Sequence, residues 1–195
     1  MAETFRNSVD HHKQNILVVI WQLIIFALAF LLGTFTKLLL PGIPSEILFK
    51  FVDVLFISGT ILLAVKLARE GWDLAAAGFT ILGVGWGVFF ASIDFFNMDV
   101  ADEMITSPLY FFIPCMLLIS CYKPFPIWIK ALNIWCIVPY LVAFIQHRIN
   151  PDYLKSNFLW MAIGFISFHT VSLIWGIFFM VQYLRESNLH RKKGS

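Results

Sequence analysis

The chain alternates between long apolar stretches and short polar ones. The apolar stretches cover residues 15–35, 47–68, 73–95, 104–122, 127–146 and 158–180. A bilayer core of roughly 30 Å is crossed by about 20 apolar residues in a helix, so the pattern predicts six transmembrane helices. Ser107, Pro108 and Pro114 interrupt the fourth stretch, but proline is tolerated in membrane helices whose neighbours satisfy the freed carbonyl groups.

The composition indicates that the whole chain belongs to a membrane. Hydrophobic residues make up 59% of the 195 residues and charged residues 13%, whereas soluble domains are about 45–50% apolar. No polar stretch is long enough to form a separate soluble domain. We expect an all-α polytopic membrane protein with a single membrane domain, residues 1–195, whose chemistry takes place within the bilayer or at its edge.

The positions of lysine and arginine predict the orientation. If the amino terminus is cytoplasmic, ten of these residues fall on the inner side, namely Arg6, Lys13, Lys66, Arg69, Lys123, Lys130, Arg185, Arg191, Lys192 and Lys193. Four fall on the outer side, namely Lys37, Lys50, Arg148 and Lys155. Positive charge concentrates in cytoplasmic loops, so we expect both termini to face the cytoplasm.

A short motif occurs twice in the chain. W-G-x-F-F covers residues 86–90 and 175–179, in the third and sixth predicted helices. Two further matches follow the same order: Leu-Leu with a later lysine at 31–37 and 117–123, and Lys-x-x-Asp at 50–53 beside Lys-x-x-Asn at 130–133. Three helices are an odd number, so the second half would be inverted relative to the first, as in many transporters. We predict a three-plus-three inverted repeat with halves 15–95 and 104–184; convergence of two apolar sequences is the alternative.

Small residues mark one face of the third predicted helix. Gly83, Gly87, Ala91 and Asp94 are spaced by four, four and three residues, so they share a face. Small residues let membrane helices approach closely. We interpret this face as a packing surface, with Asp94 at its outer end, where it contributes either to an acidic mouth that attracts cations or to a solvated loop.

The sixth predicted helix repeats this device. Ser172 and Gly176 lie on one face at helical spacing. We interpret Ser172 and Gly176 as packing positions. Trp86 and Trp175 would each fill the space beside the glycine that follows it in the sequence. The alternative is that the two tryptophans, which lie away from the usual interfacial belts, line a central pathway.

His169 is the most informative polar residue within the apolar stretches. It lies at the midpoint of the sixth stretch, where no water is present to satisfy a polar group. Such residues usually face a bundle interior or a wet cavity. His169 therefore either bonds to a neighbouring helix or uses its near-neutral pKa in proton relay, gating or substrate binding.

Two further positions carry polar groups into the predicted helices. Lys50 and Asp53 lie one turn apart near the outer end of the second helix, where they form either a structural ion pair or a site for a cation or a proton. Asn133, at the matching position of the fifth helix, is expected to bond between helices.

Three classes of function fit this pattern. We favour a small transporter or channel with a polar site near the bilayer midplane, which would move a small solute or ion and would assemble as a homo-oligomer. The alternatives are a non-catalytic membrane subunit or receptor and, less favoured, an intramembrane enzyme acting on a lipid-like substrate.

Other readings find no support in the sequence. Nucleotide loops and basic aromatic surfaces are absent, which argues against a nucleic-acid partner. The cysteines Cys115, Cys121 and Cys136 lack metal-binding spacing, and no second histidine lies deep in an apolar stretch, so we expect no metal site and identify no cofactor. We favour a bacterial inner membrane as the location over the endoplasmic reticulum, which the dilysine at 192–193 would suggest.

Overall fold

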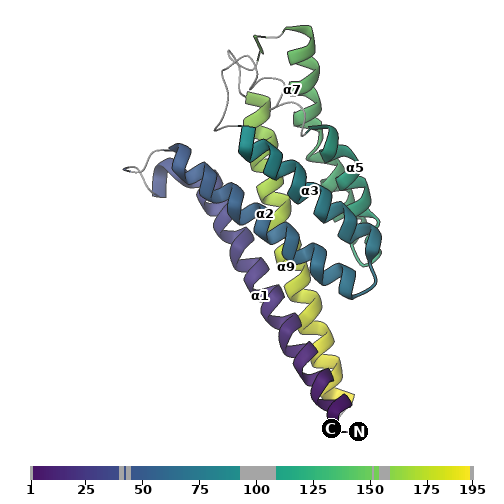
Figure 1. Ribbon diagram of the computed structural model, residues 1–195. Helices are drawn as coiled ribbons and strands as arrows, with labels where there is room; N and C mark the ends of the chain where they lie inside the picture. Colours follow the sequence, from purple (N-terminus) through teal and green to yellow (C-terminus); the bar gives the residue numbers. More distant parts are fainter. Residues whose placement is uncertain are drawn as a thin grey trace.

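The computed structural model describes residues 2–39, 42, 45–92, 109–150, 152–153 and 159–193. In chain order its helices are α1 (Ala2–Leu39), α2 (Ser45–Arg69), α3 (Asp73–Ser92), α5 (Leu109–Ser120), α6 (Ile127–Trp135), α7 (Val138–Ile149) and α9 (Leu159–Lys193) (Figure 1). These residues include no strand. The all-α prediction is therefore confirmed for the part of the chain that the structure describes.

Four helical segments are long and apolar enough to cross a membrane. They are Ile16–Phe35, Ile47–Arg69, Ile127–Ile149 and Leu159–Asn188. Two shorter apolar helices, Asp73–Val88 and Tyr110–Ser120, lie in the third and fourth predicted segments. These lengths and compositions identify a membrane-embedded protein. The count of six crossings stays a prediction, because residues 93–108, which join the two shorter helices, lie outside the described residues.

The fifth predicted helix is divided in two. Where a single helix was expected over 127–146, α6 ends at Trp135 and α7 begins at Val138. Pro139 occupies the second position of α7, and proline has no N–H to continue the bonding ladder of a preceding helix. The turn between the helices is held by backbone bonds from Cys136 to Leu132 and from Ile137 to Ile134.

The first and last helices are longer than expected. The sequence predicted helices over 15–35 and 158–180, whereas α1 covers Ala2–Leu39, with a kink at Phe35, and α9 covers Leu159–Lys193. The two helices run side by side in opposite directions, so that α1 begins at the end of the molecule where α9 finishes (Figure 1). The two chain ends therefore lie together.

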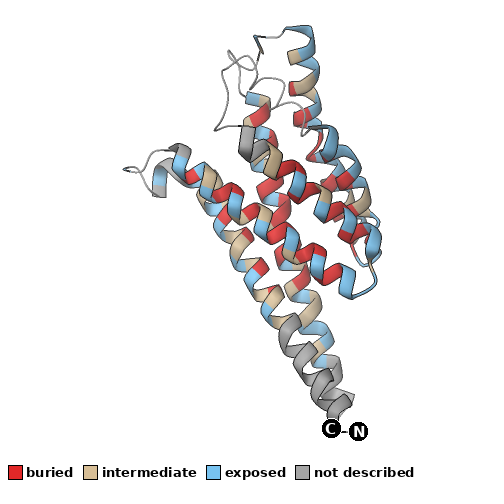
Figure 2. Ribbon diagram, in the orientation of Figure 1, coloured by how far each residue is buried: buried red, intermediate tan, exposed pale blue. Residues whose placement is uncertain are grey.

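The helices pack into a bundle with an aromatic interior. α1 packs against α2 and α9, and α3 packs against α2 and α5. Buried residues follow the sides of α2, α3 and α9 that face one another (Figure 2). The largest fully buried side chains include two tryptophans and several phenylalanines, namely Trp86, Trp175, Phe26, Phe56, Phe79, Phe112, Phe168 and Phe179.

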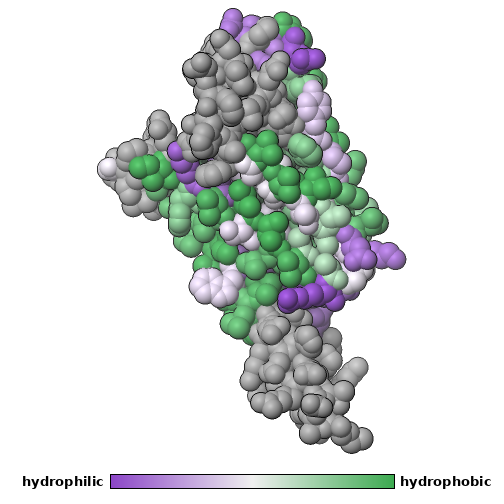
Figure 3. All heavy atoms as spheres, in the orientation of Figure 1, coloured by the Kyte–Doolittle hydropathy of each residue, from purple (hydrophilic) through white to green (hydrophobic). Residues whose placement is uncertain are grey.

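The outer surface of the bundle is apolar as well. Large side chains such as Leu17, Trp21, Leu28 and Val84 are exposed, and hydrophobic residues cover the middle of the face seen in Figure 3, with hydrophilic ones toward its ends. Soluble proteins rarely expose so much contiguous apolar surface. In a bilayer the same surface contacts lipid, which agrees with the membrane assignment.

One glycine permits a close contact between α3 and α5. A methyl group at Gly78 would lie 2.8 Å from the backbone oxygen of Cys115 and 2.8 Å from the backbone nitrogen of Ile119. The two backbones therefore approach too closely for any larger residue at this position. Membrane helices commonly associate through such small residues.

Candidate functional site

Asp53 and Trp86 form a buried pair between α2 and α3. The indole Nε1 of Trp86 donates a hydrogen bond of 2.7 Å to Oδ1 of Asp53. Both residues are 1% exposed. A carboxyl group with no water around it needs such a donor, because an unsatisfied polar group in a membrane costs several kcal/mol. The hydrogen-bond partner of Asp53 is therefore the tryptophan that begins the first W-G-x-F-F segment.

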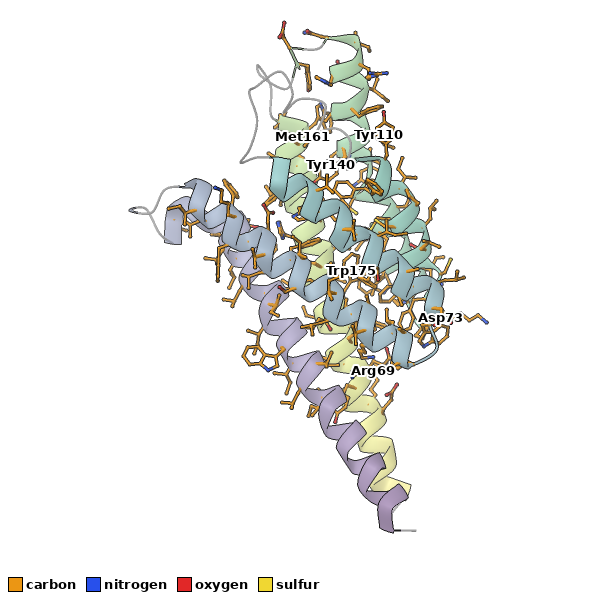
Figure 4. The ribbon with its side chains drawn as sticks, in the orientation of Figure 1. Arg69, Asp73, Tyr110, Tyr140, Met161 and Trp175 are labelled. Atoms are coloured by element: carbon orange, nitrogen blue, oxygen red, sulfur yellow. The ribbon has the colours of Figure 1, made fainter. Side chains whose placement is uncertain are left out.

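Asn133 and Trp175 form a second buried pair. The indole Nε1 of Trp175 on α9 donates a hydrogen bond of 3.0 Å to Oδ1 of Asn133 on α6. The Nδ2 group of Asn133 donates in turn to Oγ of Ser120, at the end of α5, at 3.2 Å. Asn133 therefore links three helices. Figure 4 shows Trp175 in the middle of the bundle, between the end marked by Tyr110 and Met161 and the end marked by Arg69 and Asp73.

The two pairs occupy matching places in the sequence. Asp53 and Asn133 are the last residues of the two Lys-x-x-Asp/Asn segments, and Trp86 and Trp175 begin the two W-G-x-F-F segments. In each case the indole of the motif donates to the polar side chain of the preceding lysine segment.

The rings of the two motif copies also contact each other's helix. Trp86 on α3 packs against Phe168 on α9, with ring centroids 5.3 Å apart. Trp175 on α9 packs against Phe79 on α3, with centroids 4.9 Å apart. Phe79 and Phe168 each precede their own tryptophan by seven residues. The contacts between α3 and α9 are therefore reciprocal.

A third correspondence involves α1 and α5. Phe112 on α5 packs against Trp86 at 5.4 Å, and Phe26 on α1 packs against Trp175 at 6.3 Å. Phe26 and Phe112 are 86 positions apart, the same offset as the Leu-Leu segments that begin at 31 and 117. Trp86 therefore contacts a phenylalanine on α9 and one on α5, and Trp175 contacts the matching phenylalanines on α3 and α1.

His169 lies against the first of these pairs. Its ring is T-shaped to Phe165 at 4.3 Å, to Phe56 at 5.3 Å and to Trp86 at 6.0 Å. The side chain is 0% exposed. Neither Nδ1 nor Nε2 has a hydrogen-bond partner among the described residues. The structure therefore brings His169, Asp53 and Trp86 into one cluster. Within it, His169 is the polar side chain without a hydrogen-bond partner among the described residues.

The space for His169 is provided by Gly33 on α1. A methyl group at Gly33 would lie 3.3 Å from Cδ2 and 3.5 Å from Nε2 of the histidine. Sequence reasoning missed Gly33, and it also missed Phe56, which touches both Trp86, at 4.5 Å, and His169. Phe56 follows Asp53 by one helical turn, so the helical spacing of Asp53 was the signal that could have found it.

Gln22 is a second buried polar residue of the same kind. It is 0% exposed, and neither atom of its amide has a hydrogen-bond partner among the described residues. It lies on α1 beside Gly176, where a methyl group would be 3.6 Å from its Nε2 and 3.3 Å from the Cα of Leu23. Gly176 therefore lies at a close approach of α9 to α1.

The other predicted packing residues differ in their contacts. A methyl group at Gly83 would lie 2.9 Å from Oγ1 of Thr60 on α2, so α3 approaches α2 closely there. At Gly87 the nearest atom would be Cδ1 of Ile57, at 4.0 Å, which leaves ordinary space. Ser172 is buried, and its hydroxyl donates to the backbone oxygen of His169 at 2.8 Å.

Three predicted residues remain. Lys50 is half-buried on α2, one turn before Asp53. Ala91 lies in α3, and its side chain falls outside the described residues, as does the whole of Asp94.

Two negative findings complete the description of the site. Within the described parts of the chain, no group of three or more His, Cys, Asp or Glu side chains could hold a metal ion. No protein-family model, curated protein or solved structure gives a significant match to the chain.

Proposed function

We propose that this protein is a small membrane transporter or channel, in which a solute or ion passes a polar site formed by His169 and Asp53 near the middle of the bilayer. The observation that carries the proposal is the complete burial of His169, whose two ring nitrogens have no hydrogen-bond partner among the described residues. A histidine with a purely structural role would be bonded to a neighbouring helix. Intramembrane ionisable residues are costly and usually mark substrate or ion paths.

The bundle that holds this site is proposed to consist of two inverted halves. Three sets of matched contacts support the proposal: the two tryptophan hydrogen bonds, the reciprocal rings of α3 and α9, and the phenylalanines from α1 and α5. Matched residues that also make matched contacts favour a repeat over chance similarity of apolar sequences. Inverted halves usually enclose a substrate site where they meet, and His169 on α9 meets Trp86 of the first half.

Flux through liposomes tests the proposed function. The full chain would be reconstituted, and entry of sodium, potassium, chloride and glycerol would be compared with entry into empty liposomes. We expect at least one of these probes to enter faster with the wild type, and His169→Ala to remove most of that increase. Flux that is unchanged in His169→Ala would exclude His169 from the path.

A matched control uses the next residue on the same helix. Thr170 is exposed, and its hydroxyl donates a hydrogen bond within α9, to the backbone oxygen of Ile166. Thr170→Ala should therefore leave flux at the wild-type rate. If no probe enters faster than into empty liposomes, transport of these probes is contradicted, and a role as a non-catalytic membrane subunit becomes the better explanation of the fold.

A further inference from the structure

We propose that Asp53 and His169, which both contact Trp86, form a proton-binding site, and that the proton is the ion that drives transport. This inference rests on the proposed transport function. It names the ion and the two groups that carry it.

Three helices bring the proton-binding groups together. Asp53 on α2 accepts the hydrogen bond of Trp86 on α3, and His169 on α9 packs against the same indole. Phe56 contacts both the indole and the imidazole. Asp53 is 1% exposed and His169 0%, so the site is closed to solvent in this state.

The remaining neighbours limit the charge that the site can hold. Lys50 lies one turn before Asp53 on α2, and Tyr140 on α7 packs against Phe168, whose ring also contacts Trp86. On α1, Gly33 lies against His169. On α3, Trp86 is the residue that bonds to Asp53. An uncompensated charge in such a dry interior is strongly disfavoured, so we expect the site to hold one proton, which leaves Asp53 and His169 together without net charge.

The chemistry of the step is a simple proton transfer. Uptake breaks an O–H bond of hydronium, leaves water, and forms an O–H bond on Asp53 or an N–H bond on His169. Release reverses the step on the other side of the membrane, and no electrons are transferred. Asp53 and His169 both contact the indole of Trp86, and the proposal requires both groups for the proton to pass.

The residues around Trp175 form a second cluster, which differs from the one around Trp86 in having no ionisable side chain among the described residues. At the matched position, Asn133 accepts the indole hydrogen bond of Trp175 and bonds to Ser120. None of these three side chains changes charge near neutral pH. The position that matches His169 is Thr80, which is exposed and bonds to its own helix at Ala76. The chain therefore carries one ionisable cluster and one neutral cluster on the same framework.

This comparison also provides the best test variant. Asp53→Asn converts the first cluster to the residue type that the second already contains, and the amide oxygen can still accept the Trp86 hydrogen bond. The variant should therefore fold. His169→Gln likewise keeps a polar side chain of similar length while removing the titrating group.

Infrared spectroscopy measures proton binding directly. The full chain in lipid membranes would be titrated while the C=O stretch of protonated carboxylic acids is recorded. We expect a band in the wild type that is absent in Asp53→Asn, and whose titration midpoint shifts in His169→Gln. Identical spectra and midpoints in the wild type and both variants would overturn the proposal.

Proton flux tests the role in transport. A potassium gradient with valinomycin would drive protons into liposomes that contain a pH-sensitive dye. We expect Asp53→Asn and His169→Gln to slow the flux by about a hundredfold or more, and Thr170→Ala to leave it unchanged.

The two assays separate the failure of this inference from failure of the proposed function. Probe flux that persists in Asp53→Asn and ignores a pH gradient would overturn the proton role while leaving transport standing. If no probe moves at all, the transport function fails, and the infrared titration alone decides whether the site binds a proton.

Discussion

The indole of Trp86 joins the carboxyl group of Asp53 to the ring of His169. It donates a hydrogen bond of 2.7 Å to Asp53 and lies 6.0 Å, between ring centroids, from His169. The three residues come from three helices, of which α2 and α3 are consecutive and α9 lies far along the chain. Any movement of α3 relative to α2 or α9 would therefore alter the environment of both ionisable groups at once.

Double-mutant cycles should detect each tryptophan pair separately. We expect Trp86→Phe with Asp53→Leu, and Trp175→Phe with Asn133→Leu, each to show a coupling free energy between the average of about 0.6 kcal/mol and the maximum of about 1.7 kcal/mol found for hydrogen bonds between membrane helices. The measurement is unfolding of the purified protein in detergent micelles.

The crossed cycle is the matched control. Trp86→Phe with Asn133→Leu combines residues that do not bond to each other in the structure, so their effects should add to within about 0.5 kcal/mol. Equal coupling in the crossed and direct cycles would mean that the two pairs do not act as separate contacts.

The sequence predicted where the helices lie better than it predicted how they meet. The described residues have helices in all six segments that the apolar pattern predicted, and four of these segments have the length and composition needed to cross a membrane. It missed the break at Cys136–Ile137, since proline is tolerated in membrane helices often enough that Pro139 alone does not predict one. The correspondence between Asp53 and Asn133 could be found from the sequence alone, because both follow a lysine by three residues.

The partner of Asp53 could not be found in the same way. A hydrogen bond between Asp53 and Trp86 joins residues 33 positions apart, and such a contact depends on how two helices pack. The unpaired state of His169 also depends on neighbours from α1, α2 and α3. Helical spacing on α9 identifies its face but gives no information about the helices opposite.

Replacing His169 by leucine should stabilise the protein. The buried imidazole has no hydrogen-bond partner among the described residues, and burial of an unpaired polar group costs about 1–3 kcal/mol in proteins. His169→Leu should recover part of this free energy and raise the melting temperature, while His169→Gln, which leaves another unpaired group, should not.

The control for this prediction is Thr170→Leu, an exposed position on the same turn, which should change the melting temperature little. A lower melting temperature for His169→Leu would show that the imidazole is bonded in the folded protein. Stabilisation together with loss of flux would be the expected behaviour of a residue kept for function.

Two glycines of α3 should respond oppositely to alanine. Gly78→Ala places a methyl group 2.8 Å from the backbone of α5, and overpacking of this kind costs about 1–3 kcal/mol. Gly87→Ala meets only Ile57, at 4.0 Å, and should be neutral or slightly stabilising because alanine favours the helix. Thermal unfolding of both variants measures the difference; equal effects would contradict the close contact of α3 with α5.

Cysteine labelling should establish the orientation of the chain. Cys121 is exposed and free, whereas Cys115 and Cys136 are buried. It lies two residues before Lys123, on the side that the distribution of basic residues predicts to be cytoplasmic. A charged maleimide that does not cross membranes should therefore label Cys121 in inside-out vesicles and not in right-side-out vesicles.

A second site makes this labelling decisive. Asn150 is exposed at the far end of the Ile127–Ile149 segment, so Asn150→Cys in a Cys121→Ser background should be labelled only in right-side-out vesicles. Cys121→Ser alone should remove the original labelling, which controls for reaction at Cys115 and Cys136. Labelling of both positions from the same side would mean that Ile127–Ile149 does not cross the membrane, and the inverted arrangement of the halves would fall with it, because that arrangement requires three crossings in each half.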